Sequence, residues 1–218
     1  MLQLTAADGH TFSAFEAGNV NAPRGLVVVQ EIFGVNGHMR AVSERLAGFG
    51  YRVLSPALFD RAEKGVELGY TPEDIQKGLA LRAQISEASV LADLEATAAA
   101  FGDKPVGIIG YCWGGALAWA GATRSASFKA AVGWYGGGIA AMKDATPNCP
   151  VQLHFGEKDS GIPLTDVEAI KAAHPEVPVF VYEGAQHGFG CEERPSYSPK
   201  DCELAELRSL AFFAEFLR

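Results

Sequence analysis

Apolar residues gather in six runs that do not alternate strictly with polar ones, at residues 25–30, 51–56, 105–110, 128–135, 150–156 and 177–184. Runs of this kind are typical of strands that are buried on both faces, as in a parallel sheet. The first 17 residues differ, because they alternate loosely around Asp8 and Gly9. That pattern predicts a small antiparallel hairpin laid on a sheet edge. Together these segments predict a mostly parallel sheet.

Helical periodicity separates most of the apolar runs. One helix is predicted after the candidate cap Asn36, and another where Thr71 acts as the cap, Pro72 fits the first helical position and Asp74 suits the first turn. Further helices are predicted over 87–101, 113–123, 163–173 and 201–218. The residues that recur at helical spacing are Met39, Val42, Leu46 and Phe49, then Ile75, Leu79 and Arg82, and finally Leu207, Leu210, Phe213 and Leu217 on one face.

Strand and helix alternate throughout, so we predict an α/β architecture with helices on both faces of the sheet. No repeat, low-complexity segment or linker rich in Pro, Gly or Ser divides the chain. The 218 residues, 48% of them hydrophobic, are enough for one sizeable core. A single domain over residues 1–218 is therefore predicted.

The charge balance argues against nucleic acid as a partner. The chain carries 18 Lys and Arg against 26 Asp and Glu, a formal net charge of -8, and no basic cluster that would follow a phosphate backbone. Its N-terminus lacks a basic start and a continuous apolar stretch, and no window approaches the roughly 18 apolar residues that a membrane span needs. We expect no membrane association and a cytoplasmic location, with a monomer as the default oligomeric state.

The four cysteines are expected to be free thiols, because nothing in the sequence indicates secretion. None of them forms a C-x-x-C pair, so no metal site is predicted and no organic cofactor is implied. Four of the five histidines have ordinary structural interpretations. His154 lies inside a strand, His10 beside a turn, His174 at a helix end and His38 in a first helical turn.

Residues 110–114 read G-Y-C-W-G, the G-x-C-x-G form of the strand-turn-helix elbow on which α/β-hydrolases hold their nucleophile. The glycines on either side of Cys112 leave room for strand and helix to approach closely. The turn also predicts Cys112 at a helix N-terminus, where the helix dipole favours a thiolate and the Trp113 backbone N–H points toward a developing oxyanion. A glycine-rich turn around a small buried cysteine is the alternative interpretation of this pattern.

The rest of the chain favours the catalytic interpretation. In α/β-hydrolases the nucleophile is followed by an acid and then by a histidine, each at the end of a later strand. Asp159 comes just after one predicted strand and His187 just after the next. Asp159 alone would pass for a turn residue and His187 for a loop histidine. Their joint occurrence in the required order predicts a triad of Cys112, His187 and Asp159.

At this point the sequence resembles the dienelactone hydrolase family, small α/β-hydrolases with a cysteine nucleophile. The resemblance covers nearly the whole chain. The segments that carry it are "QEIFGVNGHMR" (30–40), "GYCWGGALA" (110–118), "AVGWYGGG" (131–138), "GEKDSGIP" (156–163) and "YEGAQHGF" (182–189). The resemblance implies an α/β-hydrolase fold and hydrolysis of esters or lactones without a cofactor.

The resemblance also gives Glu31 a role that the pattern alone does not. In the family this glutamate holds the resting thiol and accepts its proton when substrate arrives. Independently, an acid at the carboxyl end of a buried strand lies in the ligand crevice of an α/β sheet. The backbone N–H of Ile32 is implied as the second oxyanion donor beside Trp113. Phe33, Trp134 and Tyr135 are expected to line the pocket, although aromatic residues at such positions are core residues about as often.

Two departures from the family concern the substrate. Studied members clamp a substrate carboxylate with two arginines, one before the nucleophile strand and one shortly after the histidine. Here Cys191 stands where the second is expected, and the earlier segment offers only Lys77 or Arg82. A lysine does not replace a bidentate arginine. Arg194 and Arg40 are further candidates for a differently placed anion, and each of these basic residues is also consistent with an ordinary surface charge.

The sequence thus favours a hydrolase of activated esters or lactones with a small-molecule substrate and a covalent thioester intermediate. A broad carboxylesterase or thioesterase that acts on non-anionic substrates is the first alternative. The second is a non-catalytic thiol protein that binds electrophiles or oxidants through Cys112. In that alternative Cys191, only four residues beyond His187, is the resolving thiol.

Overall fold

The computed structural model describes residues 1–218. Its centre is one eight-stranded sheet in the order β1-β2-β4-β3-β5-β6-β7-β8. The strands are β1 (Leu2–Thr5), β2 (Thr11–Ala17), β3 (Gly25–Val29), β4 (Arg52–Pro56), β5 (Val106–Tyr111), β6 (Ala130–Trp134), β7 (Val151–Gly156) and β8 (Val179–Tyr182). All six predicted apolar runs form strands, and these six pair in parallel. The predicted parallel sheet is confirmed.

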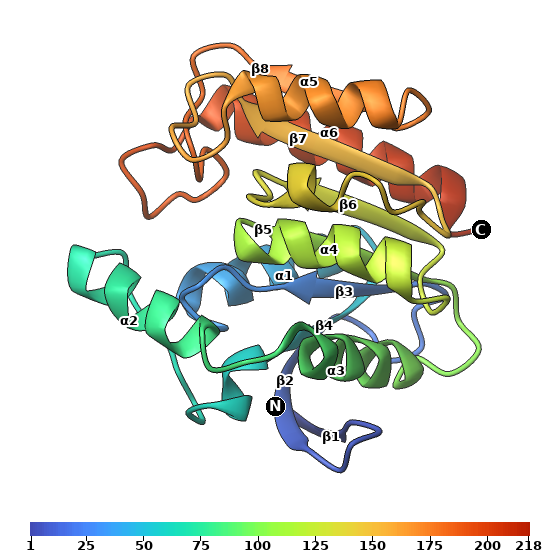
Figure 1. The fold of residues 1–218 in the computed structure, drawn as a ribbon. Coiled ribbons are helices and arrows are strands. Elements are labelled where there is room, and N and C mark those ends of the chain that lie inside the picture. Colours follow the sequence, from blue (N-terminus) through green and yellow to red (C-terminus); the bar gives the residue numbers. More distant parts are fainter.

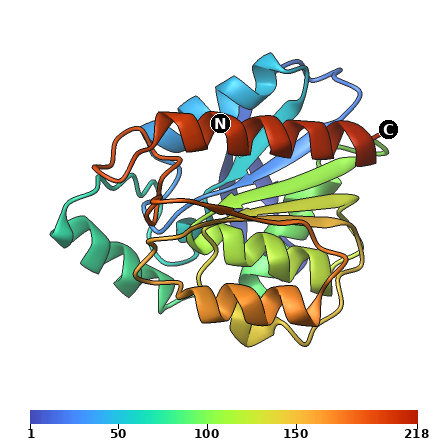
Figure 2. The same ribbon diagram turned by 90° about the horizontal axis from the view of Figure 1, so that it is seen from above.

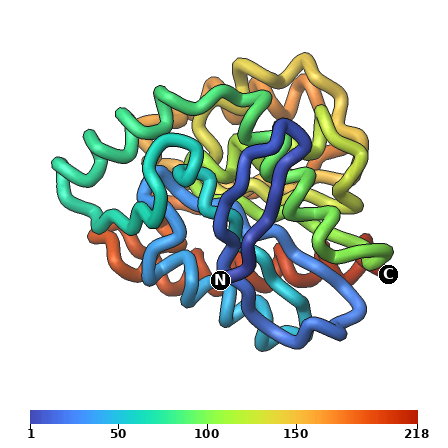
Figure 3. The backbone as a smooth tube through the Cα atoms, turned by 90° about the horizontal axis from the view of Figure 1, so that it is seen from below, coloured from blue at the N-terminus to red at the C-terminus, as the bar shows by residue number.

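The N-terminal hairpin forms one edge of this sheet. β1 pairs antiparallel with β2, and β2 pairs antiparallel with β4. Figure 3 shows the hairpin as the dark blue segment on the outside of the fold. Gly9 at its tip has φ +86°, the left-handed conformation that glycine adopts without strain. The hairpin predicted around Asp8 and Gly9 is therefore confirmed.

Helices cover both faces of the sheet. Figures 1 and 2 show α1 and α6 on one face and α3, α4 and α5 on the other, while α2 stands out beyond the carboxyl ends of the parallel strands. The helices are α1 (Gly37–Gly48), α2 (Pro72–Arg82), α3 (Glu87–Ala99), α4 (Trp113–Arg124), α5 (Leu164–Ala173) and α6 (Pro199–Phe216), with short 3-10 turns η1 (Leu58–Arg61) and η2 (Ile139–Met142). Every predicted helix is present, and none is long and apolar enough to cross a membrane.

The two predicted helix starts form as the sequence indicates. The Asn36 side chain accepts a hydrogen bond from the Met39 backbone N–H at the start of α1. At α2, Thr71 and Asp74 exchange hydrogen bonds in a capping box, with Pro72 at the first helical position. Such caps satisfy backbone donors that the first helical turn leaves unpaired.

The predicted helix faces are partly wrong. Phe49, Leu79 and Leu207 are exposed to 50%, 42% and 56%. α2 contacts the rest of the chain through Gly78 and Leu81 instead, since only these two of its residues are buried. The face of α6 that is buried consists of Asp201, Cys202, Ala205, Ser209, Phe212 and Phe213. Apolar spacing was a poor guide here because small and polar residues make the closest helix contacts.

The carboxyl ends of the parallel strands meet at one edge of the sheet. The segments that follow β3, β5, β7 and β8 all leave the sheet there, and α2 lies beside them (Figure 1). This is the edge at which open α/β sheets bind ligands. The predicted site residues that follow these strands are therefore expected near one another.

Candidate active site

Cys112 sits on a sharp turn between β5 and α4. Its backbone has φ 56° and ψ -117°, a conformation that residues other than glycine rarely adopt. The Cys112 N–H donates to the Trp134 carbonyl across the sheet, and the Cys112 carbonyl accepts from the Gly115 N–H. These bonds hold the side chain at the end of the sheet, as the elbow pattern predicts.

The glycines of the elbow are required by close backbone contacts. A Cβ atom at Gly110 would overlap the Gly114 carbonyl group, and one at Gly114 would overlap the Val29 carbonyl oxygen. The strand, the turn and the helix are therefore packed backbone against backbone. Any side chain at these two positions would displace the turn that carries Cys112.

Cys112, His187 and Asp159 form one connected line. The Cys112 Sγ lies 3.1 Å from His187 Nε2, and His187 Nδ1 lies 2.7 Å from Asp159 Oδ2. The other carboxylate oxygen of Asp159 accepts from the Gly161 N–H at 2.9 Å. Asp159 follows β7 and His187 follows β8, so the elements bring together the three residues that the sequence analysis singled out.

The surroundings of His187 favour its protonated form. Burial disfavours the imidazolium, but the hydrogen bonds to Asp159 and Cys112 outweigh burial and raise the pKa of His187. The Asp159 side chain is fully buried, whereas 27% of the His187 side chain is exposed. Asp159 thus orients the imidazole from the buried side, and the partly exposed ring is accessible to a small molecule.

The turn after β3 contributes a fixed peptide group beside the elbow. Gln30, which is fully buried, donates from Nε2 to the Glu31 carbonyl at 3.1 Å and accepts from the Leu58 N–H at 3.1 Å. On the far side of the turn, α2 lies against the Ile32 carbonyl at Gly78, where a Cβ atom would overlap that oxygen. The N–H of Ile32 itself donates to no group of the chain.

Glu31 is a fully buried carboxylate with no hydrogen-bond partner on either oxygen. Burial raises the pKa of Glu31 above its usual value, opposed chiefly by the charge of Arg194. The Arg194 Nη1 atom lies 3.6 Å from Glu31 Oε1, which is an ion-pair distance rather than a hydrogen bond. Cys112 Sγ points to His187, and no hydrogen bond joins Glu31 to Cys112.

A cavity of about 450 Å³ opens directly onto His187. Lys158 and Arg194 also line it, and no acidic side chain does. The remaining lining residues are Tyr70, Ser160, Gln186, Pro195 and Ser196. The cavity is therefore polar and positively charged beside the triad.

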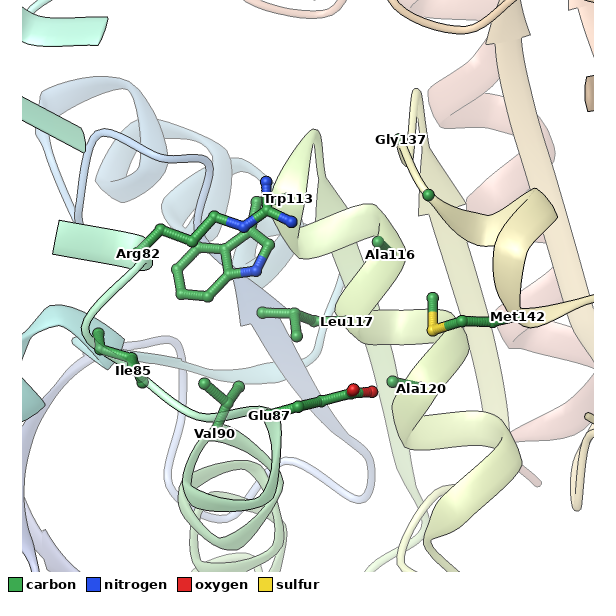
Figure 4. Close-up of a pocket in the computed structure, with 11 residues that line it drawn as sticks. Arg82, Ile85, Glu87, Val90, Trp113, Ala116, Leu117, Ala120, Gly137 and Met142 are labelled. Atoms are coloured by element: carbon green, nitrogen blue, oxygen red, sulfur yellow. The ribbon is translucent and has the colours of Figure 1, made fainter. Parts of the chain in front are cut away.

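A second cavity, of about 260 Å³, lies between α3 and α4. In Figure 4 the Arg82 guanidinium lies beside the Trp113 indole, and Leu117 and Met142 point into the same space. The Arg82 Cζ atom is 5.8 Å from the centre of the indole ring. Neither Cys112 nor His187 lines this cavity, but Trp113 directly follows Cys112, so the cavity adjoins the elbow.

The three aromatic residues predicted to line the pocket are all buried, and none lines either cavity. Trp134 lies in the core, where its indole N–H donates to Ser209 Oγ. Phe33 packs edge-on against Tyr70. The Tyr135 ring centre is 5.2 Å from that of His187, and Tyr135 is the only one of the three whose ring packs against the His187 ring.

Two other basic candidates, Lys77 and Arg40, form ion pairs with surface carboxylates. Lys77 pairs with Glu63 at 2.9 Å, and Arg40 pairs with Glu67 at 2.7 Å. Of the four basic candidates, only Arg194 reaches both the His187 cavity and a predicted site residue.

The sequence analysis missed two side chains around the site, Gln30 and Tyr70, and interpreted a third, His38, only as a residue of a first helical turn. His38 is buried, and burial lowers its pKa to about 4, so its imidazole is neutral near pH 7. Tyr70 accepts a hydrogen bond from Asn36 Nδ2 and lines the His187 cavity. The only available signal was the neighbouring helix caps, which place His38 and Tyr70 at helix starts beside this edge of the sheet.

Comparison with known proteins agrees with this architecture. A nucleophile elbow, with an acid and a histidine after later strands of a mostly parallel sheet, defines the α/β-hydrolase class. The family model described as "Dienelactone hydrolase family" matches residues 12–217, and the chain belongs to that family.

Three relatives illustrate the match. A Synechocystis protein named "Putative carboxymethylenebutenolidase" is 40% identical over 79% of this chain and 78% of its own length. The "Carboxymethylenebutenolidase" of Pseudomonas putida is 32% identical over 98% of this chain and 95% of its own. A crystal structure titled "Putative Dienelactone Hydrolase", from Klebsiella pneumoniae, superposes with a TM-score of 0.85 at 30% identity, covering 98% of both chains. The protein is a hydrolase with the α/β-hydrolase fold.

Proposed function

We propose that this hydrolase cleaves activated esters or lactones by covalent catalysis through Cys112. One observation carries the proposal: the unbroken line from Cys112 Sγ to His187 and from His187 to Asp159, at 3.1 and 2.7 Å. The distances are those at which a nucleophile, a general base and an orienting acid act together. The polar cavity over His187 gives a small molecule access to the imidazole of this line.

In the first half of the reaction, Glu31 has taken the thiol proton, and the Cys112 thiolate attacks the ester carbonyl carbon beside the His187 imidazolium. The backbone N–H groups of Ile32 and Trp113 stabilise the oxyanion of the tetrahedral intermediate. Trp113 is the first residue of α4, where a helix leaves its N–H unpaired, and the Ile32 N–H has no partner in the chain. The intermediate collapses to a thioester as His187 protonates the departing oxygen.

In the second half, His187 takes a proton from water and the resulting hydroxide attacks the thioester carbonyl. The C–S bond breaks, the acid product leaves and Cys112 regains its starting state. Asp159 fixes the imidazole so that Nε2 faces the reacting groups, and it stabilises the imidazolium. No metal or organic cofactor takes part in these steps.

The use of sulfur restricts the substrate. A thiolate leaves a tetrahedral intermediate more readily than an ordinary alkoxide, so the reaction proceeds forward only when the leaving group of the substrate is itself stabilised. An enol lactone or a phenyl ester meets this condition. Cys112 therefore favours activated esters and lactones over ordinary esters and amides.

The charge of the cavity favours an anionic substrate. Lys158 and Arg194 flank His187 without an acidic neighbour in the cavity wall. In this proposal Arg194, one of the candidates that the sequence offered for a differently placed anion, binds the anion. An anion that draws Arg194 away from Glu31 also frees this buried carboxylate, which we propose accepts the thiol proton when substrate arrives.

The properties of Cys191 weigh against the alternative in which Cys112 only senses oxidants. Cys191 is fully buried, and burial raises its pKa to about 12. A resolving cysteine is instead a thiolate that solvent reaches. No observation favours this alternative over hydrolysis.

The test is steady-state hydrolysis of a dienelactone and of 4-nitrophenyl acetate by the wild-type protein and by Cys112→Ala. We expect turnover of the dienelactone to fall by at least about 10³-fold in Cys112→Ala, because the covalent route is lost. Cys149→Ala removes a half-buried thiol between η2 and β7 and is the matched control, with unchanged rates expected. Retention of most of the rate by Cys112→Ala would exclude the covalent mechanism.

Arg194→Gln separates the substrate classes. If the substrate is anionic, KM for the dienelactone rises at least about tenfold in this variant, while KM for the neutral 4-nitrophenyl acetate stays within about twofold. Turnover of the neutral ester alone, unaffected by Arg194→Gln, would instead support a broad esterase. Absence of Cys112-dependent turnover with both substrates would overturn the proposed function.

A further inference from the structure

Three buried side chains of different chemistry converge beneath the His187 cavity: Glu31, His38 and Cys191. Glu31 and Cys191 are fully buried, and His38 is 4% exposed. They come from the turn after β3, the first turn of α1 and the loop after β8. One ligand atom from each lies within 4.8 Å of the other two. A carboxylate, an imidazole and a thiol therefore share one small space.

The polar atoms of this cluster lack partners. Both oxygens of Glu31 and the Nε2 atom of His38 are buried without a hydrogen bond. Buried polar atoms are almost always paired, because each unpaired one costs about 1–3 kcal/mol, and more when it is charged. These unpaired atoms belong to side chains whose ligand atoms lie within 4.8 Å of one another, so one shared ligand would satisfy them.

We propose that Glu31, His38 and Cys191 bind a thiophilic divalent cation, of which Zn²⁺ is the best match. Carboxylate oxygen, imidazole nitrogen and thiolate sulfur are the three ligand types that zinc accepts in proteins. Three protein ligands leave one tetrahedral position for water. The ligands come from residues 31, 38 and 191, so the site has none of the short cysteine spacings by which zinc sites are found in a sequence.

The geometry needs little rearrangement. Zinc bonds of about 2.0–2.3 Å place tetrahedral ligand atoms roughly 3.3–3.8 Å apart. Since no pair of candidate ligand atoms is more than 4.8 Å apart, closure needs at most about 1.5 Å of movement. Arg194, which lines the cavity of about 450 Å³, lies 3.6 Å from Glu31, so the cavity adjoins the cluster.

The charges balance once the thiol is ionised. A bound divalent cation displaces the Cys191 proton, which passes to solvent, and forms the metal–sulfur bond. The charges of one thiolate and one carboxylate then balance the dication, and the bound metal takes Glu31 out of the proton transfer proposed above. Arg194 opposes binding because its guanidinium already lies 3.6 Å from Glu31. Arg45, the other cation near His38, is neutralised by Glu206 at 2.6 Å.

Binding of Co²⁺ tests this site by a spectrum that does not depend on activity. Co²⁺ is added to the apo Cys112→Ser protein, so that the triad thiol contributes nothing. We expect one equivalent to bind, with a thiolate-to-cobalt charge-transfer band in the near ultraviolet. Zn²⁺ is expected to displace the cobalt and abolish the band. The outcome is independent of the proposed function, because this protein lacks the proposed nucleophile.

Four second-site variants in this background decide the assignment. Cys191→Ser is expected to remove the charge-transfer band, and His38→Gln to weaken Co²⁺ binding at least tenfold. Arg194→Gln is expected to tighten it, because a competing cation is gone. Cys202→Ser removes another buried thiol, which contacts the Gly190 carbonyl, and is expected to leave the band unchanged. A band that persists in Cys191→Ser, or cobalt binding without any thiolate band, would overturn the proposal. Circular dichroism verifies that each variant is folded.

Discussion

At the scale of single residues, the backbone near Cys112 depends on Gln30. In a trans peptide the carbonyl and the N–H point in opposite directions from one rigid plane. The Gln30 amide holds the Glu31 carbonyl, and that carbonyl belongs to the same peptide group as the Ile32 N–H. The amide oxygen of Gln30 is fixed in turn by the Leu58 N–H. Gln30 therefore sets the direction of the N–H that we propose as an oxyanion donor.

Replacing Gln30 by Leu is expected to lower kcat for the dienelactone by about 10- to 100-fold with little change in KM. The reason is that the misdirected N–H is needed in the transition state rather than for binding. The change also leaves the Leu58 N–H unpaired and lowers the free energy of unfolding by about 1–3 kcal/mol. Steady-state kinetics and urea unfolding measure the two effects.

Val28→Ala is the matched control for the loss of stability. Val28 is a fully buried residue of β3 that contributes no hydrogen bond to the turn. Its truncation destabilises the protein through a cavity, and kcat is expected to stay within about twofold of wild type. If both variants lost kcat equally, Gln30 would be a stability residue only.

The proximity of Cys112, Asp159 and His187 was predictable because a nucleophile, an acid and a histidine follow strands in a known order. Cys112, Asp159 and His187 each follow an apolar run that identifies its strand. Gln30 and Tyr70 were missed for a physical reason. Their partners are backbone or side-chain atoms up to 34 residues away, and no local pattern encodes such a contact.

At the scale of elements, α2 supports the site through a single glycine. Gly78 allows the helix backbone to approach the Ile32 carbonyl, where any Cβ atom would overlap the oxygen. Only Gly78 and Leu81 of this helix are buried, and Ile75 is a partly buried residue that packs against the core. The turn after β3 is thus held by Gln30 from one side and by α2 from the other.

Gly78→Ala is expected to lower kcat by about tenfold or more. The added methyl group pushes α2 and the Ile32 carbonyl apart and shifts the adjacent N–H, although alanine is the better helix former by about 1 kcal/mol. Kinetics with the dienelactone and a thermal melt check the two effects. A faster or unchanged enzyme would show that α2 does not position the turn.

Ala80→Gly provides the comparison within the same helix. Ala80 is exposed on α2, and glycine there costs about 1 kcal/mol of helix stability without contact with Ile32. Its kcat is expected to be close to that of wild type. The pair therefore separates contact with the turn from helix propensity.

Helix positions were predicted well and helix faces less well. The caps at Asn36 and Thr71 gave correct starts because capping is a local interaction between a side chain and the next turn. The face of α2 was misjudged because the close contact needs the absence of a side chain at Gly78. Apolar periodicity cannot register such a residue.

At the scale of the whole molecule, a buried polar layer joins the sheet to α6. His154 on β7 is fully buried, with Nδ1 2.8 Å from the Tyr182 hydroxyl and Nε2 2.9 Å from Gln152 Oε1. Ser209 of α6 lies 3.2 Å from the same imidazole nitrogen and also accepts from the Trp134 N–H. The sequence analysis expected His154 in the core, and this is confirmed. Its hydrogen-bond partners come from two strands and a helix, so its protonation is a property of the assembled fold.

This layer is expected to limit stability in acid. Burial, and then the nearby charge of Arg208, lower the pKa of His154 to about 3. A histidine whose pKa is lowered by folding contributes stability above its usual pKa of 6.5, and this contribution is lost as the pH falls from 6.5 toward 3. The free energy of unfolding is expected to fall by about 1.4 kcal/mol for each pH unit in this range. Urea unfolding of the wild type and His154→Gln between pH 7 and pH 4 measures it. The variant is expected to be less stable at pH 7 and to lose less stability toward pH 4.

His187→Gln distinguishes this effect from a general acid sensitivity. In the wild type, burial lowers the pKa of His187, but the hydrogen bonds to Asp159 and Cys112 outweigh burial and raise this pKa to about 10. Its contribution is therefore fully present below 6.5 and is lost as the pH rises toward 10, the opposite direction. In His187→Gln, the free energy of unfolding is expected to fall toward acid pH as steeply as in the wild type. Toward alkaline pH it is expected to fall less than in the wild type. If the free energy of unfolding fell equally toward acid pH in the wild type and in His154→Gln, His154 would not be the source of the acid sensitivity. The carboxylates would then be its source.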